Sequence, residues 1–295
     1  MSLATAFAPA KVNLFLHVGA PAADRFHPIA SLMVFADVGD RLAWDPAGEG
    51  LRIEGAFAAG LASESDNLVL RARAALAGWA RDAGREIAVP GGLVLEKALP
   101  IASGLGGGSS DAAAALRLLD EVWGLNVGEA RLQAIAQTLG SDTPACVVAR
   151  PALATGRGEM LSAPPRLPDL SAVLVNPGVA SPTGPVYRAY DEAVCPAGAN
   201  VPPSPEALAS PLAVFDWLSS TRNDLQVPAV RIAPAIGACL AVLADQPQTR
   251  LARMSGSGAT CFALVEGPVE AQALASRILA AYPAWWVRSC QLAGS

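Results

Sequence analysis

The order of apolar and polar residues predicts strands and helices that alternate along the chain. In residues 11–18 every second residue is apolar, which is the pattern of a β-strand whose side chains point alternately to two faces. The residues expected to face a core are Val12, Leu14, Leu16 and Val18. The residues expected to share the opposite face are Lys11, Asn13, Phe15 and His17.

Apolar spacing predicts further elements in both halves of the chain. Helices are expected over 66–80, 110–123, 129–139, 230–244 and 269–281, and strands over 92–97, 172–176, 260–265 and 285–290. The apolar stripe of the helix over 110–123 leaves Arg117, Asp120 and Glu121 on a polar face. Because strands and helices are interleaved in both halves, the expected fold class is α+β or a fold with mixed sheets.

The length and the irregular segments indicate two domains. A chain of 295 residues is longer than one compact core usually supports. The sequence Ala-Pro-Pro-Arg-Leu-Pro at 163–168 reads as a connection, so the expected domains are 1–163 and 164–295. A Pro-rich loop is expected over 196–211 and a Gly-Ser turn over 255–258.

Charge and cysteine usage exclude several classes of function. The net charge of −5 and the pI near 5.1 argue against nucleic acid or an anionic membrane as the main partner. No stretch approaches the ~20 apolar residues of a membrane helix, and no cation precedes Lys11 as it would in a secretory signal. The five scattered cysteines lack a Cys-x-x-Cys pair, which favours reduced thiols in a cytoplasmic protein: Cys146, Cys195, Cys239, Cys261 and Cys290.

A glycine-rich segment carries the strongest chemical signal. It lies between the strand over 92–97 and the helix over 110–123, and glycine lets backbone amides turn toward a ligand. The unpaired N–H groups and the dipole at a helix start favour an anion, so the segment predicts a phosphate site. Its residues are Pro100, Ile101, Ala102, Ser103, Gly104, Leu105, Gly106, Gly107, Gly108, Ser109 and Ser110.

Two other interpretations of this segment fit less well. A flexible linker would not occupy a short gap between a regular strand and a regular helix. The Gly-Lys-Ser/Thr ending of a P-loop is missing, and the dinucleotide-binding spacing does not fit either. The only two lysines of the chain, Lys11 and Lys97, each lie beside an unusual segment.

The glycine-rich segment resembles the nucleotide loop of the GHMP kinases. Together with Pro9-Ala10-Lys11-Val12-Asn13-Leu14, it is most similar to the members that act on 4-diphosphocytidyl-2-C-methyl-D-erythritol. The resemblance extends over most of the chain. Further matching segments are 26–27, 66–68, 139–144, 156–159, 176–178, 182–183, 222–224 and 254–259.

The resemblance implies a fold and an activity. The fold would pair an N-terminal domain like the second domain of ribosomal protein S5 with a ferredoxin-like C-terminal domain, with the active site in the cleft between them. The activity would be ATP-dependent phosphorylation of the 2-hydroxyl of 4-diphosphocytidyl-2-C-methyl-D-erythritol. Mg²⁺ would screen the ATP charge, with Ser109 or Ser110 in reach of it. Asn67 and Lys97 match positions near the adenine, although Lys97 is about equally well explained as a surface cation.

Lys11 and Asp142 are the catalytic residues that the resemblance implies. Asp142 would accept the proton of the hydroxyl, and Lys11 would orient Asp142 and the hydroxyl and stabilise the developing alkoxide. Two unit charges ~4 Å apart interact by about 4 kcal/mol at an effective dielectric constant near 20, which is enough to hold a geometry. Without the resemblance, Asp142 in Gly-Ser-Asp-Thr-Pro reads as a turn residue or helix cap.

The resemblance also implies the residues that bind the cytidyl substrate. They are Asn13, Phe26, His27, Thr183 and Tyr187. A base needs a stacking surface, and Phe26 offers a ring face where the family usually has Tyr. Arg25 stands where the family usually has Gly, so the backbone of this loop is expected to change. The alternative interpretations are a core residue for Phe26 and a structural loop residue for His27.

Other functions are compatible with parts of this pattern. A homoserine or mevalonate kinase would share the glycine-rich segment, but not Pro-Ala-Lys-Val-Asn or Phe26-His27. A catalytically silent nucleotide sensor would not need both Lys11 and Asp142. A dehydrogenase would need a nicotinamide-binding motif that the sequence lacks.

Overall fold

The computed structural model describes residues 4–61, 67–87, 91–193, 198–203 and 208–294. The chain forms two compact units, and each draws on segments that are distant in sequence. The first unit consists of Met1–Ala10, Gly39–Ile101 and Gly106–Ala149, and the second of Lys11–Val38, Ala102–Leu105 and Arg150–Ser295. The domain boundary expected between residues 163 and 164 stays a prediction.

The strands are β1 (Thr5–Val18), β2 (Ile29–Asp45), β3 (Leu51–Glu54), β4 (Gly92–Glu96), β5 (Ala152–Thr155), β6 (Met160–Ser162), β7 (Leu170–Asn176), β8 (Leu251–Met254), β9 (Cys261–Val265) and β10 (Trp286–Leu292). The helices are η1 (Ala58–Gly60), α1 (Leu68–Asp82), α2 (Gly107–Val122), α3 (Glu129–Gln137), α4 (Thr143–Val148), α5 (Thr183–Ala193), α6 (Pro211–Ser219), α7 (Gln226–Ile232), α8 (Pro234–Ala244) and α9 (Pro268–Ala281). None of the helices in the described part of the chain is long and apolar enough to cross a membrane.

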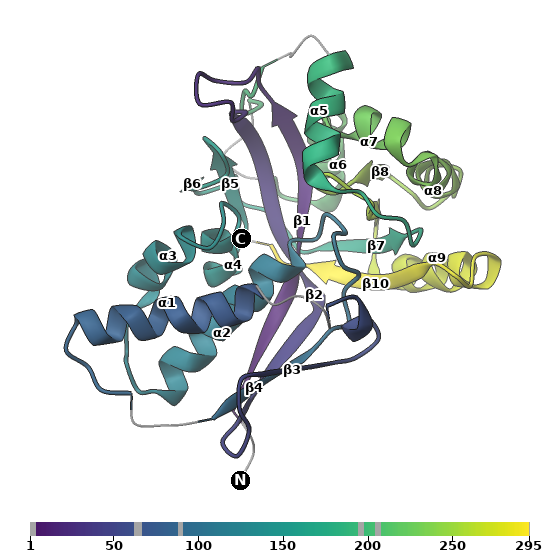
Figure 1. The fold of residues 1–295 in the computed structure, drawn as a ribbon. Helices are drawn as coiled ribbons and strands as arrows, with labels where there is room; N and C mark the ends of the chain where they lie inside the picture. The colour runs from purple at the N-terminus through teal and green to yellow at the C-terminus, as the bar shows by residue number, and fades with distance from the viewer. Residues whose placement is uncertain (1–3, 62–66, 88–90, 194–197, 204–207, 295) are drawn as a thin grey trace. The chain divides into compact units, whose positions relative to one another are not determined.

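In the first unit, a small sheet is combined with the helices α1 to α4 (Figure 1). Strand β4 pairs antiparallel with β2, from Arg41↔Glu96 to Asp45↔Gly92, and parallel with β3. Helix α2 packs against α1, α3 and α4 and is buried over most of its length. Four consecutive alanines, residues 112–115, let these neighbours approach the helix closely.

Helix α2 begins three residues before its predicted start. A run of glycines and serines favours a loop, but the amide of Ser110 donates to the carbonyl of Gly106 at 2.9 Å and closes a helical turn there. Gly106 is the N-cap residue in a left-handed conformation, with φ 63°. The first helical turn therefore consists of residues that the pattern placed in the loop.

The expected polar face of α2 is not uniformly exposed. The guanidinium of Arg117 donates to the carbonyls of Cys146, Val147 and Phe7, and burial lowers its pKa. The short helix α4, which packs against α2, supplies two of these carbonyls. Six residues are too few to show a helical period, so this contact could not be predicted.

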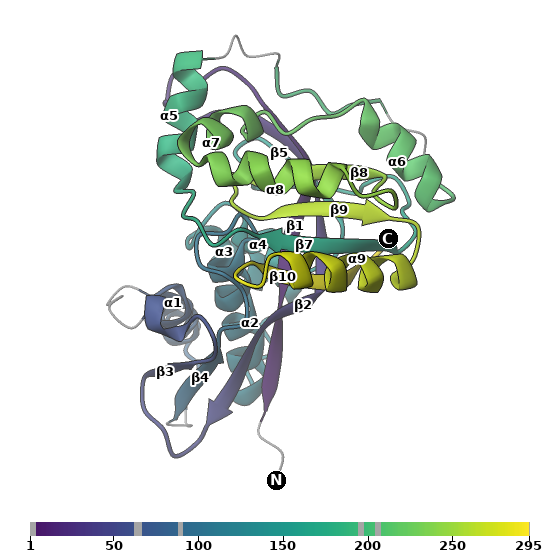
Figure 2. The ribbon, with the colours of Figure 1, turned by 90° about the vertical axis from the view of Figure 1, so that its right-hand side faces the viewer.

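In the second unit, antiparallel strands are covered by helices. Strand β7 pairs with β10 on one side, from Trp286↔Asn176 to Leu292↔Leu170, and with β9 on the other, and β9 pairs with β8. All residues of β7 are buried, as expected for a continuous apolar run in the middle of a sheet. Helix α9 packs on β7, β9 and β10, and α8 on β8 and β9 (Figure 2). The predicted strands over 172–176, 260–265 and 285–290 are confirmed to within two residues.

The helix predicted over 230–244 is wrong in one respect, because the structure divides it into α7 and α8. Pro234 has no N–H group, and its ring disfavours helical geometry at the residue before it. Ala233 accordingly has φ −131° and ψ 86°.

Strand β1 is buried on both faces from Ala8 to Val18. The expected alternation holds, but the face with the polar side chains is covered as well, and Lys11, Asn13 and His17 are each less than 5% exposed. These polar groups therefore need partners within the protein.

Some of the predicted features fall outside the described residues. The Pro-rich loop over 196–211 is described at 198–203 and 208–211, where the chain has no regular structure until Pro211 begins α6. Cys195 lies outside the described residues, while Cys146, Cys239, Cys261 and Cys290 are buried thiols.

Candidate active site

The start of α2 presents backbone amides without a side chain covering them. No side chain caps the helix, and its first turn contains no acidic residue. Gly107 and Gly108 therefore leave the N–H groups of this turn for a ligand. Ser109 is partly exposed, whereas the hydroxyl of Ser110 is buried and lies 3.4 Å from the sulfur of Cys146. Of the two serines, Ser109 is the accessible one.

The middle of the glycine-rich segment is fixed by contacts within the second unit. The carbonyl of Ser103 accepts the amide of Thr260 at 2.9 Å, and that of Gly104 accepts the hydroxyl of Ser255 at 2.9 Å. Gly104 has φ 76°, and a Cβ there would lie 2.2 Å from the carbonyl oxygen of Ser255. Glycine is required at this position for both reasons.

The remaining loop residues differ in burial. Ala102 is also left-handed, with φ 48°, and Ile101 is half-buried. Leu105 is buried, and its carbonyl accepts the amide of Lys11 at 2.8 Å. Pro100 is buried at the end of the segment that follows β4.

A pocket of about 390 Å³ lies in the first unit. All of its described lining residues except Asn67 have apolar side chains: Leu51, Ile53, Ala58, Ala59, Leu61 and Leu70. It adjoins the glycine-rich segment, because a Cβ on Gly60 would lie 2.5 Å from Ile101 Cδ1 and one on Gly108 would lie 3.3 Å from Leu68 Cδ1. An apolar pocket beside a helix start suits a flat base that is joined to phosphates.

Asn67 has two functions in this arrangement. Its side-chain oxygen accepts the amide of Val69 at 2.9 Å and so caps α1. The residue also lines the pocket, where the amide group that the cap does not use is a possible donor to a base. The helix predicted over 66–80 thus begins at Leu68, while Asp66 lies outside the described residues.

Lys97 is buried, so the interpretation as a surface cation is wrong. It is 3% exposed, and its ammonium donates to Asp40 Oδ2 and, at 2.8 Å, to Asp111 Oδ2. Burial raises the pKa of Asp111 to about 7, although Lys97 acts in the opposite direction. The two carboxylates outweigh burial and raise the pKa of Lys97. We call these three residues the charge cluster; the sequence pattern singled out neither acid.

Asp142 immediately precedes α4, as its position before Thr-Pro suggested. Its side chain makes no capping hydrogen bond to that helix, and its backbone is already helical, with φ −83° and ψ −19°. The helix-cap interpretation therefore does not account for this carboxylate, which is partly buried.

Lys11 is held by a chain of hydrogen bonds in the second unit. Its ammonium donates to Asn13 Oδ1 at 2.8 Å, and Asn13 Nδ2 donates to the hydroxyl of Ser31 at 2.7 Å. Ser31 in turn donates to the carbonyl of Phe15 at 2.6 Å. Each group in the chain is buried, so the position of the ammonium is tightly determined. Ser31 lies in β2, a strand that the sequence pattern did not predict.

His27 and Tyr187 come together as the resemblance suggested. Their ring centroids are 5.0 Å apart, and Tyr190 packs against His27 edge-on at 5.8 Å. His27 Nδ1 lies 2.8 Å from the carbonyl of Gly19, and its Nε2 lies 3.2 Å from Asp191. Both ring nitrogens face acceptors, which fixes the orientation of the imidazole.

Phe26 is 56% exposed, so it is not a core residue. The guanidinium of Arg157 lies 4.1 Å from the centre of its ring. Arg25 adopts φ 67°, a left-handed conformation that glycine accepts without strain. Arg25 thus takes a conformation that is strained for a non-glycine residue, and the change of backbone expected from the loss of glycine stays a prediction.

Thr183 begins α5 and contacts the Gly-Ser turn. Its hydroxyl lies 2.9 Å from that of Ser257, whose carbonyl accepts the hydroxyl of Ser181 at 2.6 Å. Asn223 donates to the carbonyls of Met254 and Gly256 and anchors the turn from the other side. These segments matched family motifs, but their pattern did not indicate that they support one another.

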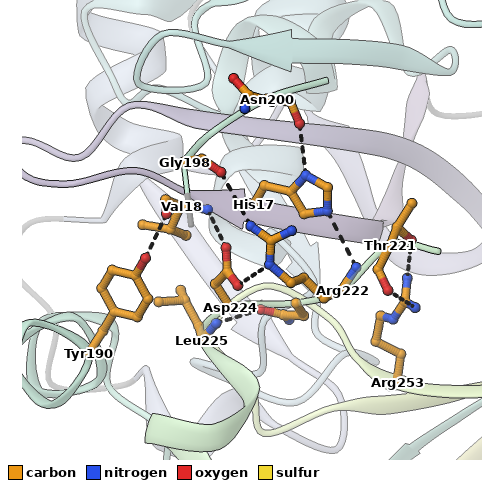
Figure 3. A network of polar contacts seen from close by, with 11 residues as sticks. His17, Val18, Tyr190, Gly198, Asn200, Thr221, Arg222, Asp224, Leu225 and Arg253 are labelled. Carbon is orange, nitrogen blue, oxygen red and sulfur yellow. Dashed lines mark hydrogen bonds and ion pairs between the residues drawn. The ribbon is translucent and has the colours of Figure 1, made fainter. Parts of the chain in front are cut away.

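A polar network holds the end of β1 in the second unit (Figure 3). His17 Nδ1 lies 2.8 Å from the carbonyl of Asn200, and burial is the main cause that lowers the pKa of His17. Asp224 accepts the amide of Val18 at 2.8 Å and the guanidinium of Arg222. The hydroxyl of Tyr190 donates to the carbonyl of Val18 at 2.6 Å. The loop that carries Phe26 and His27 therefore starts from a fixed strand end.

Family models match both parts of the chain. The model of the GHMP kinases N terminal domain matches residues 67–150, and that of the GHMP kinases C terminal matches residues 207–284. The chain belongs to the GHMP kinase family. The two-domain α+β fold expected for a GHMP kinase is thereby confirmed.

Similar proteins of known name include several GHMP kinases. A protein of Caulobacter sp. (strain K31) named 4-diphosphocytidyl-2-C-methyl-D-erythritol kinase is 56% identical over 98% of both chains. One of Xanthobacter autotrophicus (strain ATCC BAA-1158 / Py2) with the same name is 48% identical over 98% of both chains. A solved structure of 4-(cytidine 5'-diphospho)-2C-methyl-D-erythritol kinase has a TM-score of 0.74 at 34% identity and covers 99% of this chain and 100% of its own. A homoserine kinase from Cytophaga hutchinsonii, at 16% identity and a TM-score of 0.60, shares the fold.

Proposed function

We propose that this GHMP kinase transfers the γ-phosphoryl group of ATP to the 2-hydroxyl of 4-diphosphocytidyl-2-C-methyl-D-erythritol. The products are the 2-phosphate and ADP, and the reaction belongs to the non-mevalonate route to isoprenoid precursors. The observation that carries the proposal is 56% identity over nearly the full length to a kinase of that name. At that level of identity a change of substrate class would require a change at the site itself.

The proposed nucleotide site uses the first unit. The apolar pocket with Asn67 takes the adenine, and the amides at the start of α2 bind the phosphates. Among the described residues, no three His, Cys, Asp or Glu side chains form a metal site, so Mg²⁺ would arrive with the phosphates. The accessible hydroxyl of Ser109 is suited to coordinate this Mg²⁺ ion. The ion would neutralise negative charge on the transferred phosphoryl group.

The proposed chemistry assigns the proton of the substrate hydroxyl to Asp142. Lys11, held by Asn13, orients the hydroxyl and stabilises the alkoxide as it forms. Positioned acid–base groups of this kind increase the rate by a factor of about 10²–10⁴. The rest of the rate enhancement comes from positioning of the reactants and neutralisation of charge.

The proposed substrate site uses the second unit. The exposed ring of Phe26, beside the packed pair His27 and Tyr187, is the proposed stacking surface for the cytosine. Thr183 and the hydrogen-bonded Asn13 are the proposed polar contacts. Homoserine and mevalonate have no base and would leave these rings without a partner. We also propose a cytoplasmic location, which the buried thiols of Cys146, Cys239, Cys261 and Cys290 support.

One assay tests the proposal. ADP release is measured with the cytidyl substrate, homoserine and mevalonate side by side. We expect release with the cytidyl substrate alone. Release with another alcohol would change the substrate assignment, and nucleotide binding without release on any of the three would indicate a silent sensor.

A further inference from the structure

The charge cluster lies where β2, the segment after β4 and the start of α2 meet in the first unit. Asp40, in β2, is fully buried, and its carboxylate accepts three hydrogen bonds. One oxygen accepts the amides of Ala98 at 2.6 Å and Leu99 at 2.8 Å, and the other accepts the ammonium of Lys97. Asp40 thus fixes the backbone that leads into the glycine-rich segment and the side chain of Lys97 at the same time.

Lys97 extends this contact to the helix. Its ammonium donates to Asp111 in the second turn of α2 and lies 3.4 Å from the place where a Cβ of Gly107 would be. The ammonium is therefore directly beside the first residue of α2, and the position of one depends on the position of the other. The second oxygen of Asp111 is buried and has no hydrogen-bond partner.

We propose that Asp40 is a positioning residue for nucleotide binding, acting through Lys97 on the first turn of α2. The inference rests on the proposed function, because it assigns the phosphates to that turn. Asp40 is too deeply buried to contact the nucleotide itself. Phosphate binding at a helix start depends on the direction of several amides at once, so a small shift of this turn weakens all of them.

Two matched variants separate positioning from charge. At a pH well above 7, where Asp111 is ionised despite its raised pKa, both D40N and D111N remove one negative charge beside Lys97, so the comparison is made there. In D40N the amide oxygen is needed by Ala98 and Leu99, so the NH₂ group faces the ammonium, and two donors oppose each other. In D111N the amide can turn its oxygen toward Lys97, because its other end has no partner to lose. Positioning therefore predicts unequal effects, whereas charge alone predicts equal ones.

The measurement is ATP affinity by calorimetry without the second substrate, together with the KM of the cytidyl substrate. We expect D40N to weaken ATP binding about tenfold and D111N at least threefold less, with the substrate KM of D40N within about twofold of the parent. Equal weakening by both variants, or unchanged ATP affinity in D40N, would overturn the inference. A parent chain that binds no ATP would overturn the proposed function as well.

A double variant keeps the test valid if D40N folds poorly. D40N/K97M removes the opposing donor while the asparagine oxygen still accepts the two backbone amides. If Asp40 acts through Lys97, the double variant binds ATP as K97M does, within about twofold. If the double variant instead lost ATP affinity by the sum of the losses in D40N alone and K97M alone, action through Lys97 would be contradicted.

Discussion

The proposed nucleotide region and the proposed substrate region are built in different ways. The nucleotide region uses backbone amides at one helix start and a pocket lined mainly by apolar side chains from residues 51–70. The substrate region uses side chains from β1, from the loop that carries Phe26 and His27, and from α5. Hydrogen bonds such as Asn13–Ser31 and Thr183–Ser257 join them to β2 and to the turn at 255–258. The first arrangement depends on conformation, and the second depends on partners brought together by folding.

This difference teaches which kind of substitution each region tolerates. A backbone site is sensitive to any side chain that changes its φ or fills its space, whatever the chemistry of that side chain. A side-chain site is sensitive to loss of one functional group, because the partner is then left buried without a hydrogen bond. Five predictions test this contrast, from the largest expected effect to the smallest.

Lys11→Ala tests the substrate region, and we expect it to have the largest effect of the five changes. The change removes the ammonium and leaves Asn13 Oδ1 without its donor. We expect kcat to fall by about 10²–10⁴ or more. Steady-state kinetics measure kcat, and calorimetry with ATP is the control. Normal turnover would remove Lys11 from the mechanism.

Asp142→Asn removes the proposed proton acceptor and keeps its shape. Since the carboxylate does not cap α4, the helix should be preserved. We expect ATP to bind as before and kcat to fall about 10²–10⁴-fold. A kcat within threefold of the parent would show that Asp142 is not the base.

Gly104→Ala and Gly108→Ala compare two glycines of the same segment. At Gly104 the new Cβ would meet a backbone oxygen at 2.2 Å with φ 76°, so we expect a loss of about 3 kcal/mol in unfolding free energy. At Gly108 it would meet the flexible end of Leu68 at 3.3 Å, and alanine favours the helix by up to about 1 kcal/mol. Urea unfolding of both variants measures the difference, and equal losses would contradict the backbone argument.

His27→Ala removes a ring from the proposed base site. Aromatic stacking on a base contributes about 1–3 kcal/mol, so we expect the KM of the cytidyl substrate to rise about tenfold. The KM of ATP should stay within about twofold, because the nucleotide pocket is built from other residues. Phe26→Tyr, which keeps a ring, is the companion variant. If His27→Ala raised both KM values equally, a role in reading the base would be contradicted.

Arg25→Gly should have the smallest effect. Arg25 has φ 67°, and a left-handed conformation costs a non-glycine residue about 1–2 kcal/mol, part of which the flexibility of glycine in the unfolded chain offsets. We expect a gain of about 1 kcal/mol or less in unfolding free energy. Arg25→Ala is the control, because it removes the charge and keeps the strained backbone. A gain in unfolding free energy in Arg25→Ala would show that the gain comes from loss of the charge.

The elements with long, regular patterns could be predicted from the sequence. Strands β7, β9 and β10 and helices α1 and α9 lie within two residues of their expected bounds, because burial of one face or of a whole strand imposes a period on the residues. Strand β2 was missed although it has 17 residues, since its polar residues, such as Ser31 and Asp40, interrupt the apolar pattern. Both residues are buried and make hydrogen bonds to distant segments.

The sequence by itself determined the family and predicted a phosphate site, because glycine content, helix start and motif residues lie in consecutive positions. Tertiary structure alone decided the surroundings of each charge. Lys97 could be read as a surface cation until Asp40 and Asp111, 57 and 14 residues away, were seen to hold it in the interior. A buried charge is stable only with partners, and those partners come from other segments, so no local pattern reveals them.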